Sequence, residues 1–261
     1  MSRALLIFVL IIVVVSGVYM SDTKTVKNAT EIEATQAINT PAITEIEAKK
    51  AGIPLAALQY LPALAVEANR MWPASPPETN SYLAGLIDHE SGCPGLKKMC
   101  WNPSAQLKTK REEGAGMGQV TKAYREDGTL RFDKLTELRD SHPALSGLDW
   151  ATIYQRPDLQ LRAMAYMIRT GDKKFATIPA NTRFDFIDAG YNGGDGGTQS
   201  ERRHCGLTDG CNPDKWFGHV ENHCLKSRKA LYGNRSACDI NRYHVKDVRL
   251  QRQPKYRNLG V

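Results

Sequence analysis

The chain has 261 residues, of which 41% are hydrophobic and 24% charged, and this composition excludes a disordered tail, a collagen or a continuous coiled coil. The length allows one or two domains with a sizeable hydrophobic core. The formal net charge of +7 favours an anionic partner, which could be nucleic acid, a membrane surface or an acidic polymer of the cell envelope.

An apolar segment without charges opens the chain. Residues 4–20 are uncharged, and Leu5 to Val15 is an unbroken run of Leu, Ile, Phe and Val, which favours membrane insertion. As a helix the segment would span about 25 Å, near the lower limit for crossing a bilayer core of about 30 Å. We predict a signal anchor or a cleaved signal peptide over residues 1–20. Because Arg3 precedes the apolar run, the positive-inside rule places the rest of the chain outside the cytoplasm.

Residues 21–50 contain no aromatic residue and no glycine, so they have nothing to bury. A short repeat, residues 30–34 and again 44–48, recurs within this stretch, but Pro41 interrupts any continuous helix between the two copies. We predict a polar spacer in which local helix can form. The domains expected after it are a catalytic domain over residues 51–200 and a basic, cysteine-containing extension over 201–261 packed on that domain.

Two helices are predicted next. Apolar residues recur at helical spacing from Leu61 to Trp72, and Pro73 ends the run. A second helix begins at a candidate N-cap, Asn80, and places Glu90 on the same face as its apolar residues. An acid on an apolar stripe in the last turn of a helix is expected to have a raised pKa, as a general acid requires. The alternative is a helix-end glutamate that points into solvent.

Two further blocks can contribute to a site. Residues 114–121 form a glycine-rich turn, which we expect to lead into a helix and to let a polymer approach the backbone, with Gln119 as a donor and acceptor. Farther on, Phe184, Ile187 and Tyr191 share a helical face that ends at Asn192-Gly193-Gly194. Each block alone is a weak signal.

In order, Glu90-Ser91, then residues 116–121 (Gly-Met-Gly-Gln-Val-Thr), then residues 189–194 (Ala-Gly-Tyr-Asn-Gly-Gly) resemble the three hallmark blocks of the soluble lytic transglycosylase and goose-type lysozyme families. The resemblance covers about residues 55–200. The export segment and the basic extension are similar to phage endolysins of the transglycosylase type. The chain departs from the family at Gly118, where many members have methionine.

The resemblance implies a mainly α, α+β lysozyme-like fold with Glu90 as general acid and then base. It also implies a sugar site that contains Ser91, Met117, Gln119, Tyr191 and Asn192. In such enzymes the glutamic acid protonates the glycosidic oxygen and then takes a proton from the muramoyl 6-hydroxyl group, which closes a 1,6-anhydro ring without water. No cofactor and no metal is expected.

A hydrolase would need a second carboxylate across the scissile bond. The candidates are Glu112 and Glu113 beside the glycine turn, Asp188 in the predicted helix, and Asp195 after Gly194. Each is interpreted first as structural or solvated. Glu113 is the strongest of the four because it lies next to the loop that is expected to face the sugar.

Six cysteines in an exported chain indicate three disulfides. Six cysteines allow fifteen pairings, and the simplest joins neighbours in the sequence: Cys93 with Cys100, Cys205 with Cys211, and Cys224 with Cys238. A zinc site would use His219 and His223 on a helix that begins near Pro213, together with His204 and nearby cysteines, but the chain has no Cys-x-x-Cys pair. Surface histidines are the simpler interpretation.

The C-terminal end is strongly basic. Six Lys and Arg residues against Asp247 leave +5 on residues 242–261. Two interpretations stay open for these charges, which are attraction to an anionic cell envelope and an ordinary solvated face. Export argues against nucleic acid.

The sequence therefore predicts a monomeric, phage-type or bacterial enzyme that cleaves peptidoglycan. It would lie at the bacterial inner membrane, held through residues 4–20 and facing the periplasm, or be exported to the periplasm. The alternatives are a muramidase that uses water, and a membrane-tethered peptidoglycan-binding module without activity.

Overall fold

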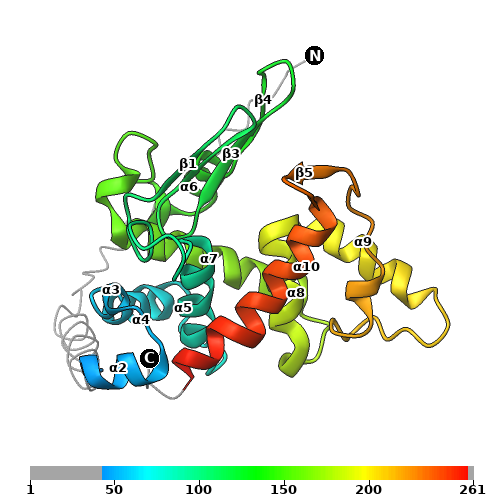
Figure 1. The fold of residues 1–261 in the computed structure, drawn as a ribbon, viewed down its shortest axis with the longest axis horizontal. Helices are drawn as coiled ribbons and strands as arrows, with labels where there is room; N and C mark the ends of the chain where they lie inside the picture. The colour runs from blue at the N-terminus through cyan, green and yellow to red at the C-terminus, as the bar shows by residue number, and fades with distance from the viewer. Residues whose placement is uncertain (1–42, 258–261) are drawn as a thin grey trace, which may run out of the picture. The chain divides into compact units, whose positions relative to one another are not determined.

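In the computed structural model, which describes residues 43–257, the chain folds mainly as α-helices with one larger antiparallel sheet (Figure 1). The α-helices are α2 (Glu45–Ala51), α3 (Leu55–Leu58), α4 (Leu61–Met71), α5 (Thr79–Glu90), α6 (Lys134–Ser141), α7 (Pro157–Lys174), α8 (Ala180–Gly193), α9 (Asp195–Gly206) and α10 (Ala237–Asp247). The strands are β1 (Gln106–Lys108), β2 (Glu112–Ala115), β3 (Val120–Tyr124), β4 (Leu130–Asp133), β5 (Ala230–Tyr232) and β6 (Arg235–Ser236). The expected mixed, mainly α class is confirmed. The predicted membrane segment, residues 1–20, lies outside the described residues.

Helix α5 is the central helix of the fold. Its residues from Ser81 to Asp88 are all buried, which is the pattern of a helix covered on every side. It begins at Thr79, one residue before the predicted cap Asn80, and it ends at Glu90 as predicted. Glu90, the carboxylate expected on the apolar stripe of this helix, therefore lies at the edge of the core.

The glycine-rich turn leads into a strand, and the predicted helix after it is wrong. Gln119 adopts a left-handed backbone conformation (φ 46°), and β3 follows directly. This strand pairs with β2 on one side and with β4 on the other, in the order β1-β2-β3-β4. Val120 and Thr121 are β-branched and fit a pleated sheet, so the two flanking partners decide the structure.

The C-terminal residues are part of the core. Beyond α10 the chain continues through a π-helical turn, η4 (Val248–Arg252), and a 3-10 turn, η5 (Gln253–Tyr256), which pack against α5. Figure 1 shows α10 running alongside α8. One hydrophobic cluster joins Trp101 and Phe186 with Trp216 and Tyr256. A boundary between residues 200 and 201 falls inside α9.

The end of the predicted spacer is structured. Thr44 caps α2 through a capping box with Glu47, and Ala48 is fully buried in the core. The second copy of the repeat is therefore a docked helix, which corrects the expectation that residues up to 50 bury nothing. The first copy lies outside the described residues.

The three disulfides join the cysteines that are neighbours in sequence. Cys93 is bonded to Cys100, Cys205 to Cys211, and Cys224 to Cys238. This pairing is the one predicted. The first bridge closes the loop that follows α5, and the third closes the segment that contains β5 and β6, directly before α10.

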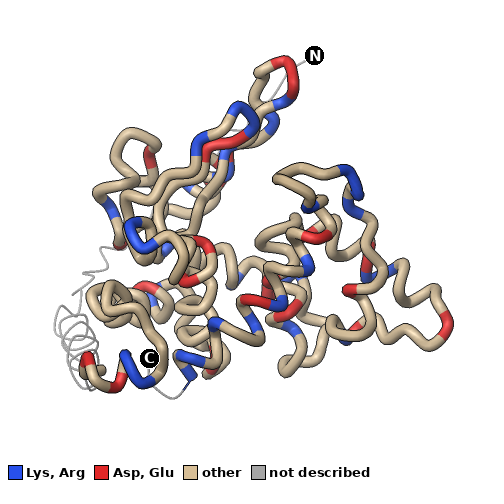
Figure 2. Tube along the Cα trace, viewed as in Figure 1, with Lys and Arg blue, Asp and Glu red and all other residues tan. Residues whose placement is uncertain are grey.

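The basic C-terminal residues are mostly paired inside the protein. Arg242 contacts Glu201 (2.8 Å), Arg249 contacts Asp185 (2.7 Å), Arg252 contacts Asp247 (2.8 Å), and Lys255 contacts Asp88 (3.0 Å). In Figure 2 basic and acidic positions accordingly lie close together around α10. These four cations form neither a free anion-binding surface nor a solvated face, which corrects both interpretations of them. Lys246 and Arg257 remain exposed.

Candidate functional site

Glu90 lies at the end of α5 with its side chain 16% exposed, so it is neither solvated like a surface glutamate nor sealed in the core. Its Oε1 lies 2.9 Å from His244 Nε2. Within the described part of the chain its Oε2 has no hydrogen-bond partner. One carboxylate oxygen is thus held by the protein, and the other is free to meet a substrate.

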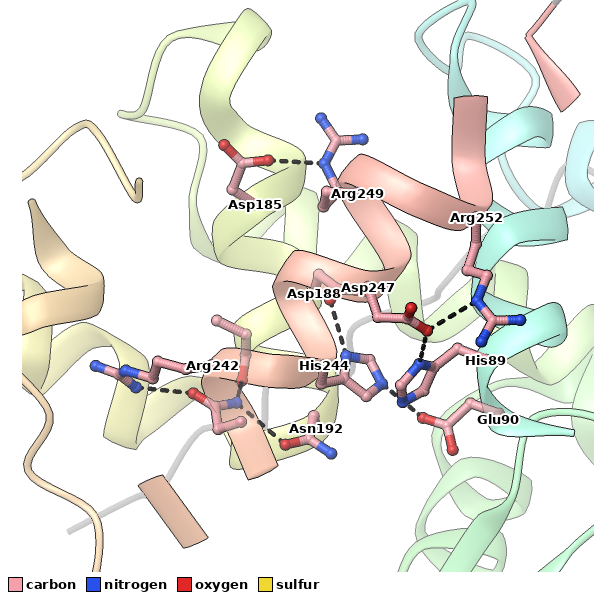
Figure 3. A network of polar contacts seen from close by, with 12 residues as sticks. His89, Glu90, Asp185, Asp188, Asn192, Arg242, His244, Asp247, Arg249 and Arg252 are labelled. Carbon is pink, nitrogen blue, oxygen red and sulfur yellow. Dashed lines mark hydrogen bonds and ion pairs between the residues drawn. The ribbon is translucent and has the colours of Figure 1, made fainter. Parts of the chain in front are cut away.

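His244 comes from α10 and lies between two carboxylates, as Figure 3 shows. Its Nδ1 is 2.8 Å from Asp188 Oδ2 on α8, opposite the contact of its Nε2 with Glu90. The His244 side chain is 2% exposed and that of Asp188 is fully buried. Three residues far apart in sequence therefore form one line of polar contacts that ends at the partly exposed Glu90.

The inner end of this line is fixed by a tyrosine. The Tyr82 hydroxyl group donates a hydrogen bond to Asp188 Oδ1 at 2.7 Å, so both Asp188 oxygens have donors. Burial, together with the Asp188 charge, raises the pKa of Tyr82 well above its ordinary value, so Tyr82 remains a donor. Asp188 is thereby oriented as the acceptor for His244.

The surroundings of His244 favour its charged form. Burial opposes the charge, but the Asp188 and Glu90 carboxylates and their hydrogen bonds outweigh burial and raise the pKa of His244 to about 10. Of the forms of the ring, only the imidazolium offers an N–H to each of the two neighbouring carboxyl groups. The site therefore stores one proton next to Glu90 at neutral pH.

This raised pKa predicts how stability depends on pH. A group whose pKa is raised from 6.5 to about 10 on folding stabilises the protein fully below pH 6.5, and this contribution disappears as the pH rises through about 10. Between pH 7 and pH 10, unfolding in urea should show a decrease in stability for the wild type that exceeds the decrease for His244→Gln by at least about 1.4 kcal/mol. Parallel curves for the two proteins would contradict this.

Tyr191 joins the three sequence blocks that were predicted to form a site. Its hydroxyl group donates to the Gly118 carbonyl oxygen at 2.6 Å, and its ring stacks on His244 with centroids 6.4 Å apart. Burial and the charges of Glu90 and Asp188 raise the pKa of Tyr191 well above its ordinary value. The end of α5, the glycine turn and the end of α8 are therefore brought together.

The glycine turn fits tightly against this tyrosine. A Cβ atom on Gly118 would lie 2.6 Å from Met164 Sδ and 3.1 Å from the Tyr191 hydroxyl oxygen. Met164 of α7 thus fills the space where a larger residue at position 118 would extend, which explains the glycine. Gln119 folds back on the turn, with Nε2 2.7 Å from the Gly116 carbonyl oxygen.

Of the other residues expected at the sugar site, Ser91 and Met117 are buried and Asn192 is exposed. Ser91 is fully buried, donates to the Ile87 carbonyl oxygen (2.6 Å) and accepts from the Trp101 amide (3.0 Å). Met117 is also fully buried. The expectation that these two side chains contact substrate is not met, because both lie in the core. Asn192 is exposed at the end of α8, where its Oδ1 accepts from Asn241 Nδ2 (3.2 Å).

The candidate second carboxylates already have partners. Glu113 pairs with Lys122 at 3.1 Å, Glu112 accepts from the Tyr232 hydroxyl group, and Asp195 pairs with Lys174. Although burial opposes the shift, Lys122 lowers the pKa of Glu113, so this group is ionised at neutral pH. Asp188 is enclosed behind His244.

If the protein cleaves peptidoglycan, as the resemblance implies, replacing Glu113 with glutamine should leave the rate within about twofold of the wild type, since a lost general acid or base would cost about a hundredfold or more. The initial rate at saturating substrate measures this. A decrease beyond a hundredfold would make Glu113 a second catalytic carboxylate.

The histidines considered for zinc do not share a helix. Residues 213–219 form turns, and only Val220–Asn222 make a 3-10 turn, η3, so the predicted helix near Pro213 is wrong. His223 lies close to Cys205 and Cys211, but these two sulfur atoms are bonded to each other. No thiolate is left there to bind a metal.

Sequence reasoning missed His244 and the role of Asp188. Asp188 is interpreted from the sequence first as structural or solvated and otherwise as a second acid, without its link to a histidine, and His244 lies in a segment interpreted from its charge. One signal was present, because Asn241, Val245 and Val248 recur at helical spacing around His244 and are buried. This stripe indicates a helix with an inward-facing histidine.

Searches with protein-family models, among curated proteins and among solved structures find no match to this chain. Among residues 43–257, no helix is both long enough and apolar enough to cross a membrane. The geometry of the site and the resemblance of its three sequence blocks are therefore the grounds for inferring a function.

Proposed function

We propose that this protein is a peptidoglycan lytic transglycosylase with a lysozyme-like fold, and that Glu90 is its catalytic acid and base. The observation that carries the proposal is the environment of Glu90. It is a partly exposed carboxylate with one oxygen bound to His244 and the other without a partner in the described chain. Tyr191, whose ring stacks on His244, holds the glycine turn through the Gly118 carbonyl oxygen.

The reaction needs one group that gives and then takes a proton. Glu90 in its acid form protonates the glycosidic oxygen between N-acetylmuramic acid and N-acetylglucosamine as the C1–O bond breaks. The resulting carboxylate then accepts the proton of the muramoyl 6-hydroxyl group, whose oxygen attacks C1 and closes the 1,6-anhydro ring. Glu90 ends in the form in which it began.

The neighbouring acids support this choice over hydrolysis. A hydrolase would need a second carboxylate across the bond, to act as nucleophile or to activate water. Glu113, Glu112 and Asp195 are held by other side chains, and Asp188 is buried behind His244. An intramolecular hydroxyl group as nucleophile removes the need for such a partner.

The proposed function includes a cellular compartment, a partner and a biological setting. The three disulfides suit an oxidising compartment, which supports action in the periplasm after export or from an anchor in the inner membrane. The partner is the glycan strand of peptidoglycan, the protein acts as a monomer, and it requires no cofactor. Bacterial lysis, in a phage or a bacterium, is the setting that fits such an activity.

Mass spectrometry of the products tests the proposal. The full, oxidised chain is incubated with purified peptidoglycan, beside Glu90→Gln and a matched control, Glu126→Gln, in which the glutamate is exposed. We expect muropeptides ending in 1,6-anhydro-N-acetylmuramic acid from the wild type and the control, and none from Glu90→Gln. Products heavier by one water would indicate a muramidase, and binding without any product would indicate an inactive binding module.

A further inference from the structure

We infer that His244 stores the proton that Glu90 uses, passing it from Nε2 to the Glu90 carboxylate before bond cleavage and taking it back afterwards. The inference rests on the proposed cleavage by Glu90 and extends it to a second residue. His244 would touch no substrate atom, so it is a positioning residue that acts through Glu90.

The geometry favours a transferable proton at this place. His244 Nε2 and Glu90 Oε1 are 2.9 Å apart, which is a hydrogen-bond distance along which a proton can move. Asp188 accepts from Nδ1 on the other side at 2.8 Å, so the ring keeps one N–H when it gives up the other. Because the ring is 2% exposed, its exchange partner is Glu90 and not the solvent.

The proton balance closes over one reaction cycle. At rest, His244 is an imidazolium and Glu90 a carboxylate. Transfer of the Nε2 proton makes a neutral imidazole and a carboxylic acid, and a half turn of the carboxyl group about its Cγ–Cδ bond presents the proton to the substrate. Glu90 gives it to the glycosidic oxygen, accepts the proton of the muramoyl 6-hydroxyl group, and returns that proton to Nε2.

Titratable and charged groups face His244 from three elements. From α5 these are Glu90 and His89, whose ring centroid lies 4.3 Å from that of His244, and from α8 they are Asp188 and Tyr191. On α10 itself Asp247 binds His89, at 2.7 Å, and also Arg252 of η4. Of these groups, Glu90 and Asp188 make hydrogen bonds to the His244 ring, which is why they control its proton.

This arrangement has a consequence for the pH range of activity. An ordinary glutamic acid loses its proton about tenfold per pH unit above a pKa of about 4.3, so an isolated general acid weakens steadily through neutral pH. A proton shared by Glu90 and His244 is kept until the pair as a whole loses it. The balance between its two positions does not depend on pH, so activity should persist well above neutrality.

A pH profile of the full chain on purified peptidoglycan tests the inference. Between pH 6 and pH 9 the wild-type kcat should stay within about threefold, whereas His244→Gln should lose about tenfold per pH unit. Glutamine retains an amide donor for Glu90 but carries no transferable proton. The matched control is His89→Gln, which removes the neighbouring imidazole and should leave the alkaline limit where the wild type has it.

The alkaline limits of activity of the variants show whether His244 supplies the proton. An alkaline limit of His244→Gln at or above that of the wild type would overturn the inference, since a purely structural or purely electrostatic role gives that result. An equal change in His89→Gln would overturn it as well. If His244→Gln does not fold, Asp188→Asn takes its place, and its alkaline limit should lie below that of the wild type. Absence of anhydro products from the wild type at every pH would instead refute the proposed function.

Discussion

Replacing Glu90 with glutamine should lower the rate of peptidoglycan cleavage by at least about a thousandfold, because one group serves both proton transfers and each such transfer is worth about a hundredfold or more. Glutamine keeps the size of the side chain and can still contact His244, so folding and peptidoglycan binding should be unchanged. The initial rate of release of soluble muropeptides measures the loss, and sedimentation with insoluble peptidoglycan measures binding.

The matched control for this variant is Glu126→Gln, which makes the same chemical change at an exposed position of the sheet region. It should retain the wild-type rate. If Glu90→Gln kept more than a tenth of the wild-type rate, Glu90 would not be the catalytic acid, and the proposed function would lose the observation that carries it.

The second large effect concerns the packing of α5 against the C-terminal residues. Gly85 lies in α5 where η5 crosses it, and a Cβ atom there would lie 2.6 Å from Gln253 N and 2.8 Å from Gln253 Cα. Backbone atoms of a packed turn cannot move aside as a flexible side chain can. Gly85→Ala should therefore destabilise the protein by about 1–3 kcal/mol, as overpacking of a core does.

Gly196→Ala is the control, since Gly196 lies in α9 with no atom within 4 Å of an added Cβ. Alanine should stabilise a helix there by about 0.5–1 kcal/mol or leave it unchanged. Urea unfolding of both variants gives the comparison. Equal stability of Gly85→Ala and the wild type would show that η5 is not held against α5 in solution.

Much of the site could be predicted because its parts are local patterns. Helical spacing placed Glu90 at the end of a buried helix, and the glycine pair after Asn192 marked the end of α8. Pairing cysteines with their sequence neighbours was correct because each bridge closes a short loop, with sequence separations of 7, 6 and 14.

The other features of the fold and of the site depend on contacts between residues that are far apart in the sequence, which local patterns do not reveal. The residues after Gln119 form a strand because β2 and β4 flank them, and neither partner is visible from the stretch itself. The charges of Arg249 and Lys255 are used by Asp185 and Asp88, each more than sixty positions away along the chain. His244 meets Glu90 across 154 positions, and they come together because α10 packs on α8 and the turn that follows it, η4, packs on α5.

Digestion of peptidoglycan in water enriched in oxygen-18 tests the central claim most directly. If the muramoyl 6-hydroxyl group is the nucleophile, the 1,6-anhydro products contain no oxygen from the solvent, and their mass is the same in both kinds of water. Reducing-end products that carry one oxygen-18 atom would show that water attacks C1, and would contradict a mechanism in which Glu90 acts without a second carboxylate.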